Sequence, residues 1–230
     1  MVQFGNMNVQ DNWNRVQETI ARHARGAVTI VAVTKGRPAE DVRAVVAAGA
    51  TVLGENRVEE VIAKYQTGGL RTELPGIQIH MIGHLQTRKV RDAVTLFDCI
   101  QSVDSAKLAR EIEKRCGDAG RATMDVLIEV NVSGEEQKYG VRPADAEELV
   151  REVIALPHLK LRGLMTMAPY TEDESVVRAA FSGLRVLAER LGTLFGPERF
   201  TVLSMGMSHD YTLACEEGST MVRIGTALFA

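Results

Sequence analysis

Eight short apolar runs, rich in β-branched residues and separated by segments of helical periodicity, recur along this sequence. They cover residues 27–33, 51–54, 77–82, 97–103, 124–130, 159–165, 200–203 and 221–224. Continuous apolar runs of this length are typical of parallel strands that are buried on both faces. One more helical segment, 11–24, precedes them all. The pattern predicts a single (β/α)₈ barrel of the TIM type with an extra N-terminal helix.

An open, doubly wound sheet would show the same alternation of strands and helices. Its usual dinucleotide-binding motif, GxGxxG after the first strand, is missing from this sequence. No linker or change of composition divides the chain. We therefore expect one domain over 1–230, in which 1–26 forms an N-terminal helical segment and 27–230 forms the barrel.

Composition and charge exclude several classes of partner. The 230 residues carry a net charge of −3 without a sustained basic stripe, which argues against nucleic acid and anionic membranes. The three cysteines, Cys99, Cys116 and Cys215, are scattered, which disfavours a disulfide framework and a metal site. The sequence has neither a signal-peptide pattern nor an apolar run of membrane-spanning length. These features predict a cytoplasmic protein.

Lys35 stands where the first apolar run gives way to a loop, in Thr34-Lys35-Gly36. The active sites of α/β barrels lie at this end of the strands. A lysine amine held there and partly desolvated loses its proton more easily and can form a Schiff base with a carbonyl compound. The alternative for Lys35 is an ordinary solvated surface lysine.

The loops after the last two predicted strands are the usual phosphate site of such barrels. Here they contain 203–208 and 223–226, which combine small residues with Ser and Thr hydroxyls. Backbone N–H groups can approach an anion closely where side chains are small. The same glycines could instead serve only to form tight turns.

Two polar residues near the predicted strand ends have two interpretations each. Arg223 interrupts the apolar eighth run, so it either forms a structural ion pair or faces a ligand in the barrel mouth. Asn56 follows the second run and either caps the next helix or orients a ligand. His80 and His84 flank the third run, where hydrogen-bonded scaffold is the more common role for histidine.

Several segments together resemble a known family, the pyridoxal phosphate homeostasis proteins, which are related to the barrel half of alanine racemase. The segments that carry the resemblance are Ala32-Val33-Thr34-Lys35, Gly54-Glu55-Asn56-Arg57, His80-Met81-Ile82-Gly83-His84-Leu85-Gln86, Leu203-Ser204-Met205-Gly206-Met207-Ser208 and Val222-Arg223-Ile224-Gly225-Thr226. The resemblance runs from about residue 28 to the C-terminus with the segments in order. It implies a fold-type III barrel that binds pyridoxal 5′-phosphate (PLP).

The resemblance also implies a role for each of six residues. It has Lys35 binding PLP as a Schiff base, Arg223 meeting the pyridine nitrogen and Asn56 lying beside the ring. The phosphate is assigned to Ser204, Gly225 and Thr226. The implied function is intracellular PLP (vitamin B6) homeostasis, in which the protein buffers PLP or delivers it to apo PLP-dependent enzymes.

The alternative function is that of a small single-domain amino acid racemase. Racemases of this type carry a second, β-rich domain that supplies a tyrosine base across a dimer interface, whereas this chain continues only six residues beyond Ile224. None of the four tyrosines is an obvious replacement, and loss of a general base typically lowers a rate by roughly 10²–10⁴-fold. We therefore expect a monomeric carrier without catalytic residues of its own.

Overall fold

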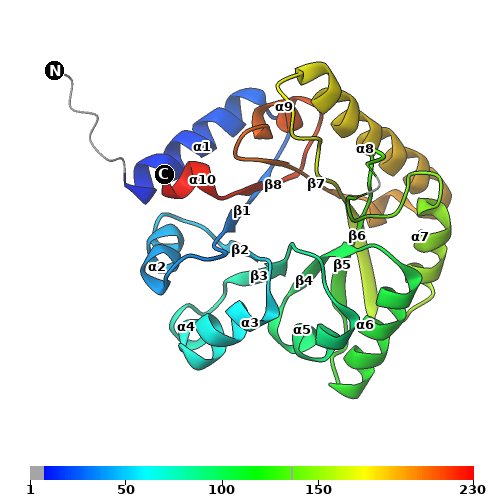
Figure 1. Cartoon of the computed structure of the whole chain (residues 1–230), viewed down its shortest axis with the longest axis horizontal. Coiled ribbons are helices and arrows are strands. Elements are labelled where there is room, and N and C mark those ends of the chain that lie inside the picture. Colours follow the sequence, from blue (N-terminus) through cyan, green and yellow to red (C-terminus); the bar gives the residue numbers. More distant parts are fainter. Residues whose placement is uncertain (1–7, 136) are drawn as a thin grey trace.

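The computed structural model describes residues 8–135 and 137–230 and confirms the predicted barrel (Figure 1). Eight parallel strands form one closed sheet in sequence order, β1 to β8, with β8 pairing back to β1. The strands are β1 Thr29–Val33, β2 Val52–Glu55, β3 Gln78–Met81, β4 Cys99–Val103, β5 Met124–Glu129, β6 Leu159–Met165, β7 Val202–Met207 and β8 Met221–Ile224. All eight predicted strands are present, because each apolar run is buried in the closed sheet.

Helices surround the barrel between the strands. The α-helices are α1 Val9–His23, α2 Ala39–Ala47, α3 Val58–Val61, α4 Leu70–Glu73, α5 Val90–Leu96, α6 Ala106–Asp118, α7 Ala146–Ile154, α8 Glu174–Phe195, α9 Tyr211–Glu216 and α10 Thr226–Phe229. A π-helix, η1 Ile62–Thr67, continues α3, and short 3₁₀ turns lie at η2 Thr87–Lys89 and η3 Pro197–Arg199. The segment after β2 is therefore a short α-helix followed by a π-helix.

The extra N-terminal helix is α1, and it closes the outer layer of the barrel. Its first turn is capped by the Asn8 side chain, which accepts a hydrogen bond from the Asp11 N–H at 3.0 Å. Trp13 is one of the apolar residues that α1 buries against the barrel. Asn12 donates to the carbonyls of Leu228 and Ala230, so the two ends of the described chain lie together (Figure 1). Residues 1–7 of the predicted 1–26 segment lie outside the described residues.

Strand β7 is longer than the sequence pattern predicts. The predicted run ends at residue 203, because Ser204 and Gly206 are typical of a loop, whereas the observed strand continues to Met207. Gly206 has a φ of +96° and lies at an irregularity in the pairing with β8. A Cβ atom at this position would lie 2.6 Å from the Cβ of Ala214 in α9. Gly206 thus forms a bulge inside a strand and not a turn after one.

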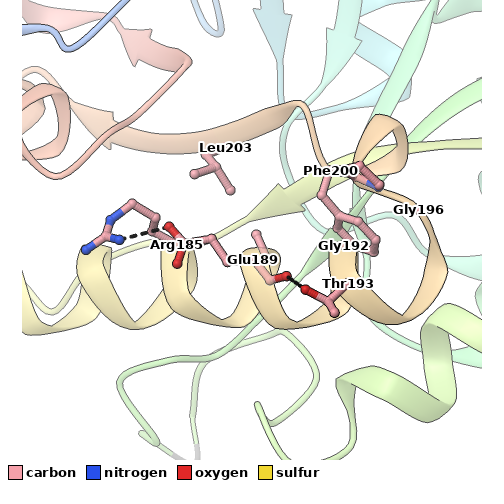
Figure 2. Close-up of a pocket in the computed structure, with 9 residues that line it drawn as sticks. Arg185, Glu189, Gly192, Thr193, Gly196, Phe200 and Leu203 are labelled. Atoms are coloured by element: carbon pink, nitrogen blue, oxygen red, sulfur yellow. Dashed lines mark hydrogen bonds and ion pairs between the residues drawn. The ribbon is translucent and has the colours of Figure 1, made fainter.

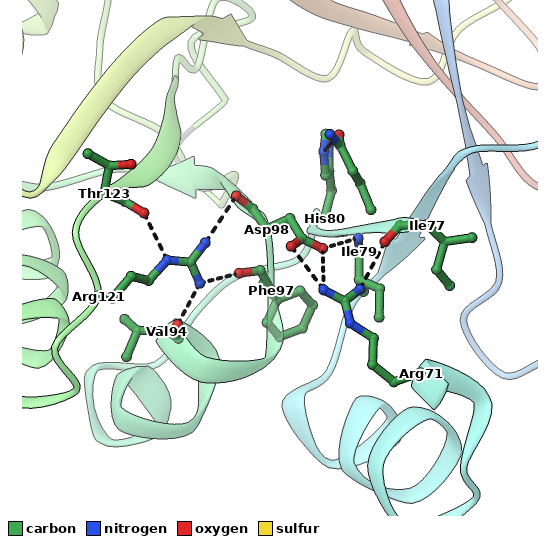
Figure 3. Close-up of polar contacts among 10 residues, drawn as sticks. Arg71, Ile77, Ile79, His80, Val94, Phe97, Asp98, Arg121 and Thr123 are labelled. Atoms are coloured by element: carbon green, nitrogen blue, oxygen red, sulfur yellow. Dashed lines mark hydrogen bonds and ion pairs between the residues drawn. The ribbon is translucent and has the colours of Figure 1, made fainter. Parts of the chain in front are cut away.

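The end of the barrel opposite the carboxyl termini of the strands is held by arginines (Figure 3). Arg71 forms an ion pair with Asp98, whose carboxylate also accepts from the Ile79 N–H at 2.8 Å. Arg121 donates to the carbonyls of Val94 and Phe97. These bonds fix the start of β4 beside β3, which is a structural role.

The cysteines, the possible metal ligands and the helix lengths of the described residues complete the fold. Cys99, Cys116 and Cys215 are all buried and free. Among residues 8–135 and 137–230, no group of three or more His, Cys, Asp or Glu side chains could hold a metal ion. Within the same ranges, no helix combines the length and the apolar character needed to cross a membrane.

Candidate functional site

A cavity of about 280 Å³ opens at the carboxyl ends of the strands, where α/β barrels carry their sites. Its lining combines residues from the ends of six strands and the loops that follow them. The lining residues are Val33, Lys35, Arg37, Asn56, Ile82, Met167, Met207, Ser208, His209, Arg223, Gly225 and Thr226. Five of the six predicted site residues are among them, and the sixth, Ser204, is not. The volume lies near the lower end of the range for small-molecule sites, roughly 300–1,000 Å³.

Lys35 lies two residues after the end of β1 and is exposed at the cavity. The expectation of a partly desolvated amine therefore does not match the described structure, in which the side chain reaches solvent. The preceding residue, Thr34, is fully buried, and its N–H donates to the carbonyl of Gly54 at 3.0 Å. Lys35 thus presents an exposed side chain next to a hydrogen-bonded backbone, able to meet an electrophile that enters from solvent.

Arg223 lies in β8 with only 4% of its surface exposed, and it also lines the cavity. Its guanidinium donates to the backbone carbonyls of Ser204 and Thr166, both at 2.8 Å, and to the Ser204 hydroxyl at 2.7 Å. Burial lowers the pKa of Arg223 to about 10, and the carboxylate of Glu129 opposes this effect. The side chain therefore remains cationic near neutral pH and presents a fixed hydrogen-bond donor group to the cavity.

Ser204 belongs to a chain of hydrogen bonds that crosses the barrel interior. It is fully buried and donates to Gln101 at 2.6 Å, and Gln101 in turn contacts the ring of His80 at 2.9 Å. Burial lowers the pKa of His80 to about 4, so the imidazole is neutral near pH 7. Because β7 continues past residue 203, Ser204 points into the barrel below the cavity instead of standing in a loop. His80 has the scaffold role that its position predicts.

Ser208 occupies the place at which Ser204 was expected. It lines the cavity, and its hydroxyl accepts from the backbone N–H groups of Gly225 at 3.1 Å and Ala227 at 3.2 Å. Thr226 is exposed beside them. The hydroxyls of Ser208 and Thr226 thus lie at one corner of the cavity, where hydroxyl groups can donate hydrogen bonds to an anion. The missed signal is the second serine of Ser204-Met205-Gly206-Met207-Ser208, which stands after the strand.

Asn56 follows β2 and lines the cavity, so the ligand-facing interpretation agrees with its position better than the capping one. The cap of α3 is Arg57, and no side chain there bonds to the helix. Gly83 approaches Asn56 so closely that a Cβ atom at residue 83 would lie 2.8 Å from the Asn56 carbonyl oxygen. His84 lies at the mouth as well, where it stacks on Tyr139 with ring centroids 3.9 Å apart.

A larger cavity, of about 620 Å³, lies between α8 and β7 on the outside of the barrel (Figure 2). Its polar side chains pair with one another, since Arg185 bonds to Glu189 at 2.9 Å and Thr193 bonds to the Glu189 carbonyl. Phe200 and Leu203 contribute apolar surface. Without polar groups that converge on the space, this cavity is a poorer candidate than the mouth.

A known protein family matches nearly the whole chain. The family described as alanine racemase, N-terminal domain, matches residues 7–230. The pyridoxal phosphate homeostasis protein of Aquifex aeolicus is 42% identical over 217 residues, which cover 94% of this chain and 92% of the relative. The corresponding protein of Pasteurella multocida is 35% identical, with 97% of each chain covered. The chain belongs to the pyridoxal phosphate homeostasis protein family.

Solved structures extend the comparison. PipY from Synechococcus elongatus PCC7942, solved with PLP bound, has a TM-score of 0.86 and 34% identity to this family member, covering 97% of this chain and 100% of PipY. An alanine racemase of Clostridium difficile 630 has a TM-score of 0.76 at 17% identity, with 95% of this chain and 56% of the racemase covered. The racemase likeness concerns the fold alone.

Proposed function

We propose that this protein binds PLP at the barrel mouth and takes part in PLP homeostasis by buffering PLP or delivering it. The observation that carries the proposal is the convergence in one cavity of an exposed lysine, a buried arginine and a hydroxyl-lined anion corner. The PLP-bound structure of PipY, which shares the fold over the whole chain, supports it.

The residues present fit the chemistry of PLP. Ser208, Gly225 and Thr226 would hold the phosphate, because Ser208 and Thr226 offer hydroxyl donors and the small Gly225 lets an anion approach the backbone. Arg223 would donate to the pyridine nitrogen and Asn56 would lie beside the ring. When bound, PLP would supply an aldehyde, and Lys35 would offer the amine that condenses with it.

The tyrosines favour a carrier over a racemase. A ring nitrogen that accepts from Arg223 would stay unprotonated and be a weaker electron sink, but alanine racemase shares this arrangement, so Arg223 alone does not separate the two functions. No tyrosine of the described residues lines the cavity. Tyr65 is buried with its hydroxyl bonded to Glu55, and Tyr139 stacks on His84. The exposed lysine also leaves PLP open to attack by free amines, as release to an acceptor requires.

The test is to mix the PLP-loaded protein with an apo PLP-dependent enzyme and to follow the return of that enzyme's activity. Free PLP at the same total concentration is the control for passive dissociation. Amino acid racemisation by the loaded protein is assayed in parallel. We expect reactivation of the acceptor without appreciable racemisation. A robust turnover that disappears in Lys35→Ala would overturn the carrier function in favour of the racemase.

A further inference from the structure

The backbone on both sides of Lys35 is held by charged side chains to which the family resemblance assigns no role. Thr34 donates from its hydroxyl to the Glu55 carboxylate at 2.7 Å, and both side chains are fully buried. Lys64 donates to the Thr34 carbonyl at 2.9 Å. On the other side, the Gly36 N–H donates to the Glu60 carboxylate at 2.8 Å. The residue before Lys35 and the residue after it are thus each bonded to an ionised group.

These groups form one network, which we name the loop clamp: Glu55, Glu60, Lys64 and Tyr65. Lys64 joins its parts, since its ammonium lies 2.6 Å from Glu55 and 3.7 Å from Glu60. Tyr65 also donates to Glu55, at 3.0 Å. Burial, reinforced by the charge of Glu55, raises the pKa of Tyr65 above its ordinary range, so its hydroxyl keeps its proton.

The local fold is built to bring the clamp together. Glu55 ends β2, while Lys64 and Tyr65 are consecutive residues of the π-helix η1. π-Helical turns are rare and occur often at functional sites. One oxygen of Glu55 accepts three hydrogen bonds, whereas its other oxygen, also buried, has no partner. Burying an ion pair with an unsatisfied oxygen is a poor way to gain stability, which indicates a role other than stability.

We propose that the loop clamp positions Lys35, so that its amine reaches the aldehyde of PLP in reactive geometry. This inference rests on the proposed function and assigns the clamp to one step of it, the formation of the covalent bond. The clamp residues bond to Thr34 and Gly36, the neighbours of Lys35, so they act on Lys35 through its backbone and are positioning residues. A loop that shifts by about 1 Å can lower the rate of such a step by roughly 10²-fold.

The test compares two ligands that differ at the reacting atom. Pyridoxine 5′-phosphate has the ring and phosphate of PLP but carries an alcohol in place of the aldehyde, so it cannot bond to Lys35. Glu60→Ala removes the acceptor of the Gly36 N–H on a partly exposed side chain, which keeps the risk of misfolding low. Glu60→Gln retains an acceptor at this place. Glu59→Ala is the matched control, because Glu59 is the neighbouring residue and pairs with Lys89 away from the loop.

In stopped-flow absorbance, Glu60→Ala is expected to form the covalent complex with PLP about ten- to a hundredfold more slowly than the native protein. Its affinity for pyridoxine 5′-phosphate should be unchanged. Glu60→Gln should recover most of the rate, and Glu59→Ala should behave as the native protein. Two results would overturn the role of the clamp. One is a Glu60→Ala variant that reacts with PLP at the native rate. The other is a variant whose affinity for pyridoxine 5′-phosphate falls by as large a factor as its rate with PLP. A native protein that binds neither ligand would instead overturn the proposed function, and the clamp with it.

A second variant tests the buried part of the clamp. Lys64→Met leaves the Glu55 carboxylate without its cation, so its folding must be checked by circular dichroism. The double variant Lys64→Met with Glu55→Gln removes both charges and avoids this cost. We expect the double variant to fold, to bind pyridoxine 5′-phosphate normally and to react slowly with PLP. A double variant that reacts with PLP at the native rate would contradict the role of the buried pair.

Discussion

At the scale of single residues, one cavity brings together Lys35, Asn56, Arg223, Gly225 and Thr226. Strand-end positions led to Lys35 and Asn56, because such residues follow apolar runs at the same end of a parallel sheet. Ser204 was assigned to the phosphate, but it lies inside the barrel, and Ser208 lines the cavity in its place. Ser204 lies within β7 and Ser208 lies just after it. Amino-acid composition alone does not predict where the strand ends, so it does not tell the two serines apart.

Ser208→Ala is therefore expected to weaken the binding of PLP about ten- to a hundredfold, because hydrogen bonds to charged groups contribute about 1.5–3 kcal/mol. Binding of pyridoxal, which lacks the phosphate, should be unchanged. Isothermal titration with both ligands measures the difference. Ser204→Ala serves as the comparison. It removes a partner of Gln101 and Arg223 and should lower the free energy of unfolding by about 1–3 kcal/mol.

The assignment of the phosphate to Ser208 would be wrong if Ser208→Ala bound PLP and pyridoxal as the native protein does. The original assignment would be restored if Ser204→Ala, still folded, lost affinity for PLP alone.

At the scale of elements, periodicity predicted every strand, but it did not predict the end of β7 or the π-helix η1. β7 continues through Gly206, since the positive φ of a glycine can form a bulge within a strand as well as a turn after it. The π-helix η1 was also missed, because its residues follow an ordinary helical pattern. Both irregular elements lie beside the candidate site, where local rules are often broken for function.

Gly206→Ala tests whether the bulge is required. The substitution places a Cβ atom 2.6 Å from Ala214 at a φ of +96°, so strain and overlap act together. We expect the free energy of unfolding in urea to fall by about 2–4 kcal/mol. The control is Gly120→Ala, at a φ of +65° with no atom within 4 Å of the added Cβ, where we expect a loss of about 1 kcal/mol. Equal losses in the two variants would show that β7 tolerates a side chain at the bulge.

At the scale of the whole molecule, two buried groups oppose one another in the pH dependence of stability. Burial raises the pKa of Glu129 to about 7, so between pH 4.5 and 7 the folded protein binds more protons there than the unfolded chain. Its contribution to stability therefore falls as pH rises. Burial lowers the pKa of His80 to about 4, so below pH 6.5 the unfolded chain binds more protons, and this contribution rises with pH.

Glu129→Gln separates the two effects, because His80 is common to both proteins. The free energy of unfolding of the variant minus that of the native protein should increase from pH 5 to pH 7, by at most about 1.4 kcal/mol per pH unit. Urea denaturation at pH 5, 6, 7 and 8 measures it. A difference that does not change with pH would show that Glu129 titrates as an ordinary carboxyl group.

The central claim, that Lys35 binds PLP in the barrel mouth, is tested most directly by reducing the loaded protein with borohydride and mapping the modified peptide by mass spectrometry. We predict one major adduct, on Lys35, which is the one lysine among residues 8–135 and 137–230 that lines the cavity. Lys35→Ala should lose this adduct while it keeps weaker, phosphate-dependent binding. An adduct found mainly on another lysine, in the native protein at one equivalent of PLP, would contradict the account.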